Sequence, residues 1–341
     1  MEITNVLIIV LTCFAISALI VPVVKKIAVH VGALDKPEKR KIHKNPMPRL
    51  GGLGIFIAFI FGYILFSDQS TEMLSILMGS FFIIIIGIID DIKPLPATIK
   101  LGGQLIATCI VVFYGGILLN RIVAFGFNIE FGILAYPITI FFILGAINAI
   151  NFIDGLDGLA GGVSSIYFLT IGIIIFLLNQ QGSLAFILTF IMLGSILGFL
   201  VHNFHPAKIF MGDSGSMFLG FIIAIVALLN FKTATFTTLI IPMLLLAIPI
   251  FDTSCAILRR KLKGRPISKP DKEHLHHQFL GMNLSHRKTV LLIYGINILF
   301  AFASIVHILN YNQLGMIIYI LILAVLLWII TKTNIISDKK K

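Results

Sequence analysis

Charged residues are scarce in this chain: 12% of its 341 residues are Asp, Glu, Lys or Arg, and 58% are apolar. Soluble globular domains carry about 25% charged and about 45–50% apolar residues. Three cysteines, each within or at the edge of an apolar run, support neither a disulfide framework nor a zinc site. The composition therefore excludes a soluble enzyme, a nucleic-acid-binding domain and a secreted disulfide scaffold, and we expect no nucleic-acid partner.

The sequence contains several long runs of apolar residues without any charged residue. Residues 5–24 and 73–89 contain no Asp, Glu, Lys or Arg, and about 17–25 apolar residues suffice to cross the hydrocarbon of a bilayer. The first run lacks a basic start, so we expect an uncleaved helix rather than a signal peptide. The predicted spans are 5–24, 51–67, 73–89, 101–119, 132–150, 159–178, 184–201, 215–230, 236–257, 289–309 and 313–331. We therefore expect an all-α, polytopic protein of about eleven transmembrane helices, with residues 1–341 forming a single domain in the lipid bilayer.

The basic residues orient these spans. Of 26 Lys and Arg residues, all but Arg121 and Lys232 fall in one set of alternate connections or in the tail. Because cytoplasmic loops are enriched in Lys and Arg, this bias predicts an external N-terminus and a cytoplasmic C-terminus. The long loops 25–50 and 259–288 and most of the acids lie on the same side. We expect an active-site cleft at the cytoplasmic face.

Asp90 and Asp91 end the third predicted span. Two acids at a helix C-terminus oppose the helix dipole, and adjacent carboxylates repel each other unless a cation lies nearby. Lys100 begins the next span and could neutralise the pair or hold a phosphate. Acids at a membrane border are costly and tend to be functional, so the pair is a candidate catalytic site.

Two further polar clusters lie between spans. Asn148, Asn151, Asp154 and Asp157 recur every three residues, a spacing that gathers them on one stripe of a helix. The third cluster centres on Asp213, in the sequence Gly-Asp-Ser-Gly. A serine-protease interpretation of that motif fails, because it needs His and Asp partners on a soluble scaffold.

Basic residues and histidines in the two long loops are further candidate site residues on the same side of the membrane. His274, His276 and His277 lie among basic residues in the second long loop, where phosphate contact is favoured over zinc. Lys44 and Arg49 precede a Gly-Gly helix entry, where a phosphate can approach backbone amides; the same basic segment could instead grip anionic lipid. Acids, amides and cations on one face suit phosphoryl transfer from a metal-bound nucleotide diphosphate to a membrane-held acceptor.

Four segments in this order resemble one family. They are Asp90-Asp91, the run from Asn148 to Ala160, the run from Phe210 to Ser216, and the histidine loop. Together they resemble the polyprenyl-phosphate N-acetylhexosamine-1-phosphate transferases, the family of the MraY, WecA and TagO enzymes. The resemblance covers nearly the whole chain and implies transfer of a sugar 1-phosphate from a UDP-sugar to undecaprenyl phosphate, with release of UMP and a requirement for Mg²⁺, with Mn²⁺ as the alternative.

The resemblance also implies roles for individual residues. It assigns a metal-ligand role to Asp213 with Asn151 beside it, and activation of the lipid phosphate to Asp90 and Asp91, with Asp154 as a further acid of the site. The implied substrate contacts are Asp157, Asn203 and Phe210 for uridine, and Lys44 and Lys100 near the diphosphate; Arg49, Asn148, His274, His276 and His277 complete the predicted substrate-binding set. Because a phosphate monoester is largely dianionic at neutral pH, the acid pair could serve to place a cation instead of removing a proton.

Details of the motifs favour one branch of the family. The His-Leu-His-His run that starts at His274 and the Pro48-Arg-Leu-Gly-Gly run resemble the WecA/TagO branch, which uses UDP-N-acetylglucosamine. We therefore expect a bacterial plasma-membrane enzyme that begins a teichoic-acid or O-antigen type of polymer; a homodimer is left open. The alternatives are the MraY reaction on UDP-MurNAc-pentapeptide and, as another class, a secondary transporter, although no repeated half is evident.

Overall fold

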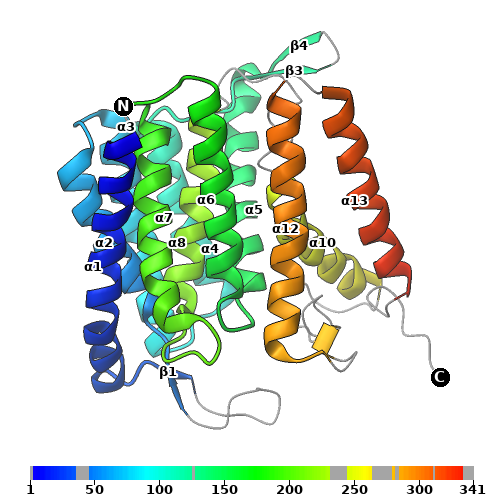
Figure 1. Ribbon diagram of the computed structural model, residues 1–341. Helices are drawn as coiled ribbons and strands as arrows, with labels where there is room; N and C mark the ends of the chain where they lie inside the picture. Colours follow the sequence, from blue (N-terminus) through cyan, green and yellow to red (C-terminus); the bar gives the residue numbers. More distant parts are fainter. Residues whose placement is uncertain are drawn as a thin grey trace.

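The computed structural model describes residues 3–35, 46–124, 127–230, 244–262, 279–280, 284–309 and 312–332 (Figure 1). Its helices are α1 (Ile3–His30), α2 (Gly51–Phe66), α3 (Thr71–Ile92), α4 (Ala97–Cys109), α5 (Ala135–Ile153), α6 (Leu159–Leu177), α7 (Leu184–Asn203), α8 (Gly212–Asn230), α10 (Ala247–Leu262), α12 (His286–Ile308) and α13 (Asn312–Lys332). A π-helical turn, Ile110–Tyr114, continues α4, and a 3₁₀ turn, Gly132–Leu134, leads into α5. The predicted all-α class is confirmed.

Eight of the helical stretches in the described ranges are long and apolar enough to cross a membrane, and α2 and residues 313–325 of α13 are shorter apolar helices. The protein is therefore a multi-pass membrane protein. The count of eleven spans stays a prediction: the ninth predicted span, 236–257, lies partly outside the described residues, and α10 begins only at Ala247.

Two short antiparallel strand pairs lie at opposite ends of the helical bundle (Figure 1). One is β1 (Leu34–Asp35) with β2 (Met47–Pro48), and the other is β3 (Arg121–Ala124) with β4 (Phe127–Glu130). The β1–β2 end also holds the end of α3 and the starts of α2, α4 and α8. This arrangement brings the sequence clusters to one end of the molecule.

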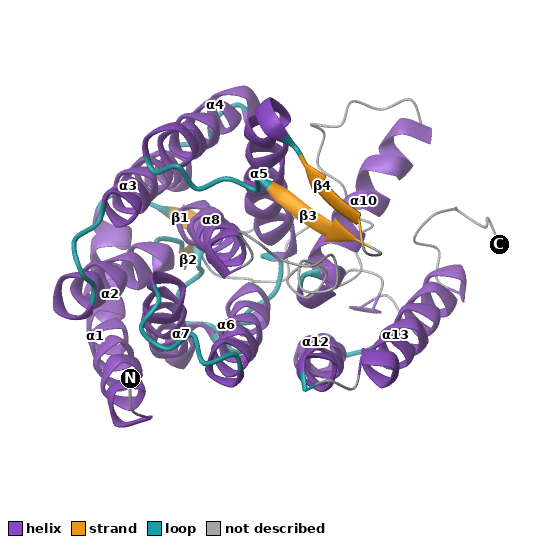
Figure 2. Cartoon of the chain, turned by 90° about the horizontal axis from the view of Figure 1, so that it is seen from above, coloured by secondary structure: helices purple, strands orange, loops and turns teal. Residues whose placement is uncertain are grey.

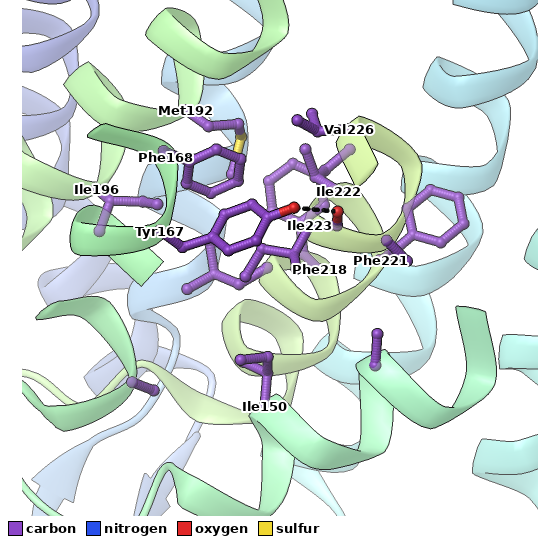
Figure 3. Packing of buried hydrophobic residues seen from close by; sticks show 14 of the residues in the cluster. Ile150, Tyr167, Phe168, Met192, Ile196, Phe218, Phe221, Ile222, Ile223 and Val226 are labelled. Atoms are coloured by element: carbon purple, nitrogen blue, oxygen red, sulfur yellow. Dashed lines mark hydrogen bonds between the residues drawn. The ribbon is translucent and has the colours of Figure 1, made fainter. Parts of the chain in front are cut away.

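Helix α8 is the centre of the bundle, enclosed by α2, α3, α5, α6 and α7 (Figure 2). Its residues are apolar on all sides from Met217 to Leu228, the pattern of a fully buried helix. Figure 3 shows the ring of Tyr167 from α6 in this core, with its hydroxyl donating to the Ile223 carbonyl over 3.2 Å. That bond satisfies the polar end of a buried aromatic side chain and ties α6 to α8.

Glycines let the neighbours of α8 approach its first turn. A methyl group at Gly52 on α2 would overlap the backbone of Gly215, and one at Gly87 on α3 would overlap the backbone of Ser214. These close approaches fix the start of α8 against the end of α3, which is where the acids lie.

Candidate active site

Asp91, at the end of α3, caps the start of α8. Its carboxylate accepts hydrogen bonds from the backbone N–H of Asp213 (2.9 Å), from the backbone N–H of Ser214 (3.2 Å) and from the Ser214 hydroxyl (2.7 Å). The first N–H groups of a helix have no partner within the helix, so an acceptor here stabilises the helix start. Arg49 donates to the same carboxylate through Nε over 3.0 Å. Asp91 is thus bound to backbone, hydroxyl and guanidinium at once.

Backbone pairing builds this corner of the site. The Phe210 N–H donates to the Pro48 carbonyl, and the N–H groups of Gly51 and Gly52 donate to the carbonyls of Phe210 and Met211, all within 2.9 Å. Gly212 follows with a φ of 75°, a left-handed conformation that glycine adopts readily. The segment before α8 and the segment before α2 therefore hold each other in register, and this pairing brings Arg49 beside Asp213.

Two cations link the remaining carboxylates. Lys100 Nζ lies 2.8 Å from Asp213 Oδ2 and 3.4 Å from Asp90 Oδ2. Arg49 reaches Asp213 Oδ1 over 3.3 Å and Asp90 Oδ2 over 3.9 Å. The second oxygen of Asp90 accepts from the Leu95 N–H over 2.8 Å. Although burial disfavours the charged guanidinium, the surrounding carboxylates outweigh it and hold the pKa of Arg49 above its ordinary value.

This group of three acids could hold a divalent cation, chiefly through Asp90 and Asp213, because the oxygens of Asp91 are already bonded to α8 and to Arg49. Asp90, Asp91 and Asp213 each offer a carboxylate oxygen, and these atoms lie within 4.8 Å of one another. Hard cations such as Mg²⁺ prefer oxygen ligands, so the donor set fits. Two basic side chains already compensate these three carboxylates, which leaves a formal charge that a cation would neutralise. An acidic cluster able to hold a metal is therefore present.

The predicted polar stripe ends beside this cluster. Asp154 directly follows α5; burial, together with the charges of Asp213 and Asp91, raises its pKa to about 8. Asn151 donates from Nδ2 to the Ser216 hydroxyl over 2.8 Å, on the first turn of α8. The acids from three separate segments therefore share one electrostatic environment.

One turn deeper in the bundle, Asn148 belongs to a buried polar chain. Its Nδ2 donates to the Gln104 side-chain carbonyl over 2.9 Å and to the Leu144 carbonyl over 2.8 Å. The Nε2 of Gln104 in turn lies 3.2 Å from the sulfur of Met217. This chain joins α4, α5 and α8 directly below the acids.

A second cluster gathers around Asp157. Its Oδ2 accepts from His205 Nδ1 over 2.7 Å and from the Ala207 N–H over 3.1 Å, and His286 Nε2 lies 4.0 Å away. The rings of His205 and His286 stack with centroids 4.3 Å apart and planes 20° apart. Asp157, His205 and His286 each offer one ligand atom within 4.8 Å of the others, as a metal site would; in the structure Asp157 is hydrogen-bonded to His205 and to the Ala207 N–H.

Asn203 fixes the loop that carries Asp157. Its Oδ1 accepts from the Gly158 N–H over 3.0 Å, and its Nδ2 donates to the Ile209 carbonyl over 2.9 Å. The Tyr294 hydroxyl on α12 donates to the Gly158 carbonyl. Asn203 therefore joins the α5–α6 loop to the segment before α8.

The structure brings together most of the predicted residues and adds two. Arg49, Lys100 and the acids form one cluster, and Asp157 and Asn203 form its neighbour. Sequence reasoning missed His205 and His286 as site residues; the only local signal was the position of His205 in the motif before Asp213. The predictions for Lys44, His274, His276 and His277 lie outside the described residues.

The chain is similar in sequence to known membrane transferases. Residues 73–230 match glycosyl transferase family 4, which spans both the acid pair of α3 and the start of α8. The chain is 42% identical over 293 residues to a probable undecaprenyl-phosphate N-acetylglucosaminyl 1-phosphate transferase of Bacillus subtilis, covering 84% of this chain and 81% of that protein.

More distant relatives agree. A decaprenyl-phosphate N-acetylglucosaminephosphotransferase of Mycolicibacterium smegmatis is 33% identical over 80% of this chain and 74% of its own length. An undecaprenyl-phosphate alpha-N-acetylglucosaminyl 1-phosphate transferase of Haemophilus influenzae is 33% identical, over 80% of this chain and 78% of that protein. The fold and the cation-linked acids define a polytopic membrane enzyme, and the chain belongs to glycosyl transferase family 4. The family that the four motifs implied is confirmed.

Proposed function

We propose that this protein transfers GlcNAc-1-phosphate from UDP-GlcNAc to undecaprenyl phosphate, giving undecaprenyl-diphosphate-GlcNAc and UMP. The observation that carries the proposal is the Asp90, Asp91 and Asp213 cluster bridged by Arg49 and Lys100 at one end of a membrane bundle. The names of the relatives from Bacillus subtilis and Haemophilus influenzae support this donor sugar and this acceptor.

The cations of the cluster suit a diphosphate. Lys100 and Arg49 hold carboxylates through side-chain contacts of 2.8–3.9 Å. Flexible side chains can exchange a carboxylate partner for a phosphate oxygen of similar charge. Phosphoryl transfer depends chiefly on positioning and charge neutralisation, which two such cations supply.

The acids would hold the metal. Asp213 and Asp90 offer carboxylate oxygens, and Asn151 on α5 is tied to the same helix as Asp213 by its hydrogen bond to Ser216 of α8. When bound, Mg²⁺ would neutralise charge on the diphosphate. Because the acceptor phosphate is largely dianionic at neutral pH, the acids contribute more by placing cations than by removing a proton.

The second cluster would hold the nucleoside. In the proposal Asp157 and Asn203 bind uridine and the ring of Phe210 stacks on uracil; Lys44 and the histidines of the second long loop would contact phosphate. Asp157 and Asn203 are held in fixed orientations by His205 and by the backbone of residue 158. Preorganised polar groups of this kind favour specific recognition of a ligand.

The orientation of the site belongs to the same proposal. The ends of α3, α5 and α7 lie together with the start of α8, on the side that holds 24 of the 26 Lys and Arg residues by the predicted topology. The positive-inside rule makes that side cytoplasmic, where a soluble nucleotide sugar would be available. We propose the bacterial plasma membrane as the location.

A two-donor assay tests the function. Purified protein in detergent is given undecaprenyl phosphate and Mg²⁺ with labelled UDP-GlcNAc or, in parallel, labelled UDP-MurNAc-pentapeptide. Label in the lipid phase from UDP-GlcNAc alone, with UMP release, is the expected result. Label from the muramyl donor alone would reassign the substrate, and no transfer from either by folded protein would refute the proposal.

A further inference from the structure

We infer that Asp91 is a positioning residue: it holds the start of α8 and the guanidinium of Arg49, and through them places the carboxylate of Asp213. It does not itself touch the substrates. The inference rests on the proposed function in that Asp213 is taken as the metal ligand. It separates two neighbouring acids, Asp90 and Asp91, that the sequence presents as an equivalent pair.

The hydrogen bonds of Asp91 leave it no capacity for a substrate. A carboxylate has about four lone-pair sites. Asp91 accepts four hydrogen bonds, from Arg49 Nε, the Asp213 N–H, and the N–H and hydroxyl of Ser214. Its side chain is 0% exposed. A proton acceptor for the lipid phosphate needs a free, reachable oxygen, which Asp91 lacks.

Asp90 and Asp213 differ in the nature of their partners. Oδ2 of Asp90 and both oxygens of Asp213 contact the flexible cations Arg49 and Lys100 and receive no backbone N–H in the described part of the chain. Those cations can move when a metal or a diphosphate arrives. Two of the four donors to Asp91 are backbone N–H groups of a buried helix, which cannot move away without unwinding α8.

The connection from Asp91 to Asp213 is direct. Asp213 follows Gly212 at the start of α8, and its own N–H is bound by Asp91. Fixing that N–H fixes the first turn, from which the Asp213 side chain projects toward Lys100. An anion at a helix N-terminus is also favoured by the helix dipole. Partners that orient a metal ligand in this way affect metal affinity by about 10–100-fold.

The test is a Mn²⁺ titration of purified protein, followed by electron paramagnetic resonance, which reads metal binding without turnover. Asp91→Asn should raise the Mn²⁺ Kd about 10–100-fold, and Ser214→Ala should raise it several-fold. Because the Ser214 hydroxyl acts through Asp91, the double variant should resemble Asp91→Asn alone instead of showing the product of the two effects. Ser195→Ala is the matched control, since its hydroxyl bonds within α7 to the Ile191 carbonyl, and it should leave the Kd unchanged.

Three results would overturn the inference. One is an unchanged Mn²⁺ Kd in Asp91→Asn with loss of transfer, which would place Asp91 on the substrate. Another is a double variant whose rise in Mn²⁺ Kd equals the product of the rises in the two single variants. If Asp91→Asn does not fold, an unchanged Kd in Ser214→Ala decides against the inference by itself. Failure of the proposed function would appear differently, as wild-type protein that binds Mn²⁺ but transfers nothing from either donor.

Discussion

The substitution Gly87→Ala tests how closely α3 and α8 must approach. A methyl group at Gly87 would overlap the Cα and N atoms of Ser214. The obstacle is the backbone of a buried helix, not the end of a side chain, so α3 or α8 must shift. Overpacking of this kind costs about 1–3 kcal/mol, and occasionally more. Alanine recovers about 1 kcal/mol of helix propensity, so we expect a net loss of about 1 kcal/mol, with about 2 kcal/mol as the upper end of this range.

A shift of Ser214 should also displace the carboxylate of Asp213, because the two residues are neighbours on the first turn of α8. We expect Gly87→Ala to raise the Mn²⁺ Kd by about 10-fold or more, as a displaced ligand carboxylate would. Unfolding in detergent measures stability, and Mn²⁺ titration measures the site.

Gly102→Ala is the matched control. Gly102 also lies in an apolar helix, α4, but a methyl group there meets no atom within 4 Å. The control should gain up to about 1 kcal/mol of stability and keep wild-type Mn²⁺ affinity. If Gly87→Ala behaved like Gly102→Ala in both measurements, the close approach of α3 to α8 would not be what positions the site.

Three further predictions concern the chemistry. Asp213→Asn should reduce Mg²⁺-dependent transfer by about 10²–10³-fold, the size of effect seen when one preorganised charge-stabilising group is lost; wild-type turnover in the lipid-label assay would contradict its role as ligand. Phe210→Ala should raise the KM for UDP-GlcNAc by about 10-fold with little change in kcat, because an aromatic stack on a base contributes about 1–3 kcal/mol; an unchanged KM would remove the stacking role. His205→Ala deletes the 2.7 Å bond to Asp157 and should raise the same KM several-fold while the Mn²⁺ Kd stays constant; a change in Mn²⁺ binding instead would mean that the two clusters act as one.

Much of the architecture was predictable from local pattern. Uncharged runs and the placement of Lys and Arg predicted a multi-pass helical protein with its acids at helix ends, and the acids do meet at one end of the bundle. The helix between Gly212 and Asn230 was predicted only from residue 215, because its first turn depends on Gly212 and on a cap from Asp91, which is 122 residues away. Local sequence contains no sign of such a cap.

Arg49 illustrates the same limit within the site. Its place beside a Gly-Gly helix entry predicted phosphate contact, and that role stays a prediction. In the structure its guanidinium lies among Asp90, Asp91 and Asp213, a position set by the backbone pairing of residues 48–52 with 210–211. That pairing joins segments about 160 residues apart.

The sequence by itself determined the membrane class, the family and the residue types of the site, because hydrocarbon thickness, loop charge and four ordered motifs act through composition and spacing. The tertiary structure alone decided that Asp91 is bound to the start of α8 and to Arg49, whereas Asp90 lies beside Lys100. It also decided that Asp157, His205 and His286 meet. The physical reason is that side chains of neighbouring residues on a helix point in different directions. Only the packing of α8 against α3 determines which groups each of these side chains contacts.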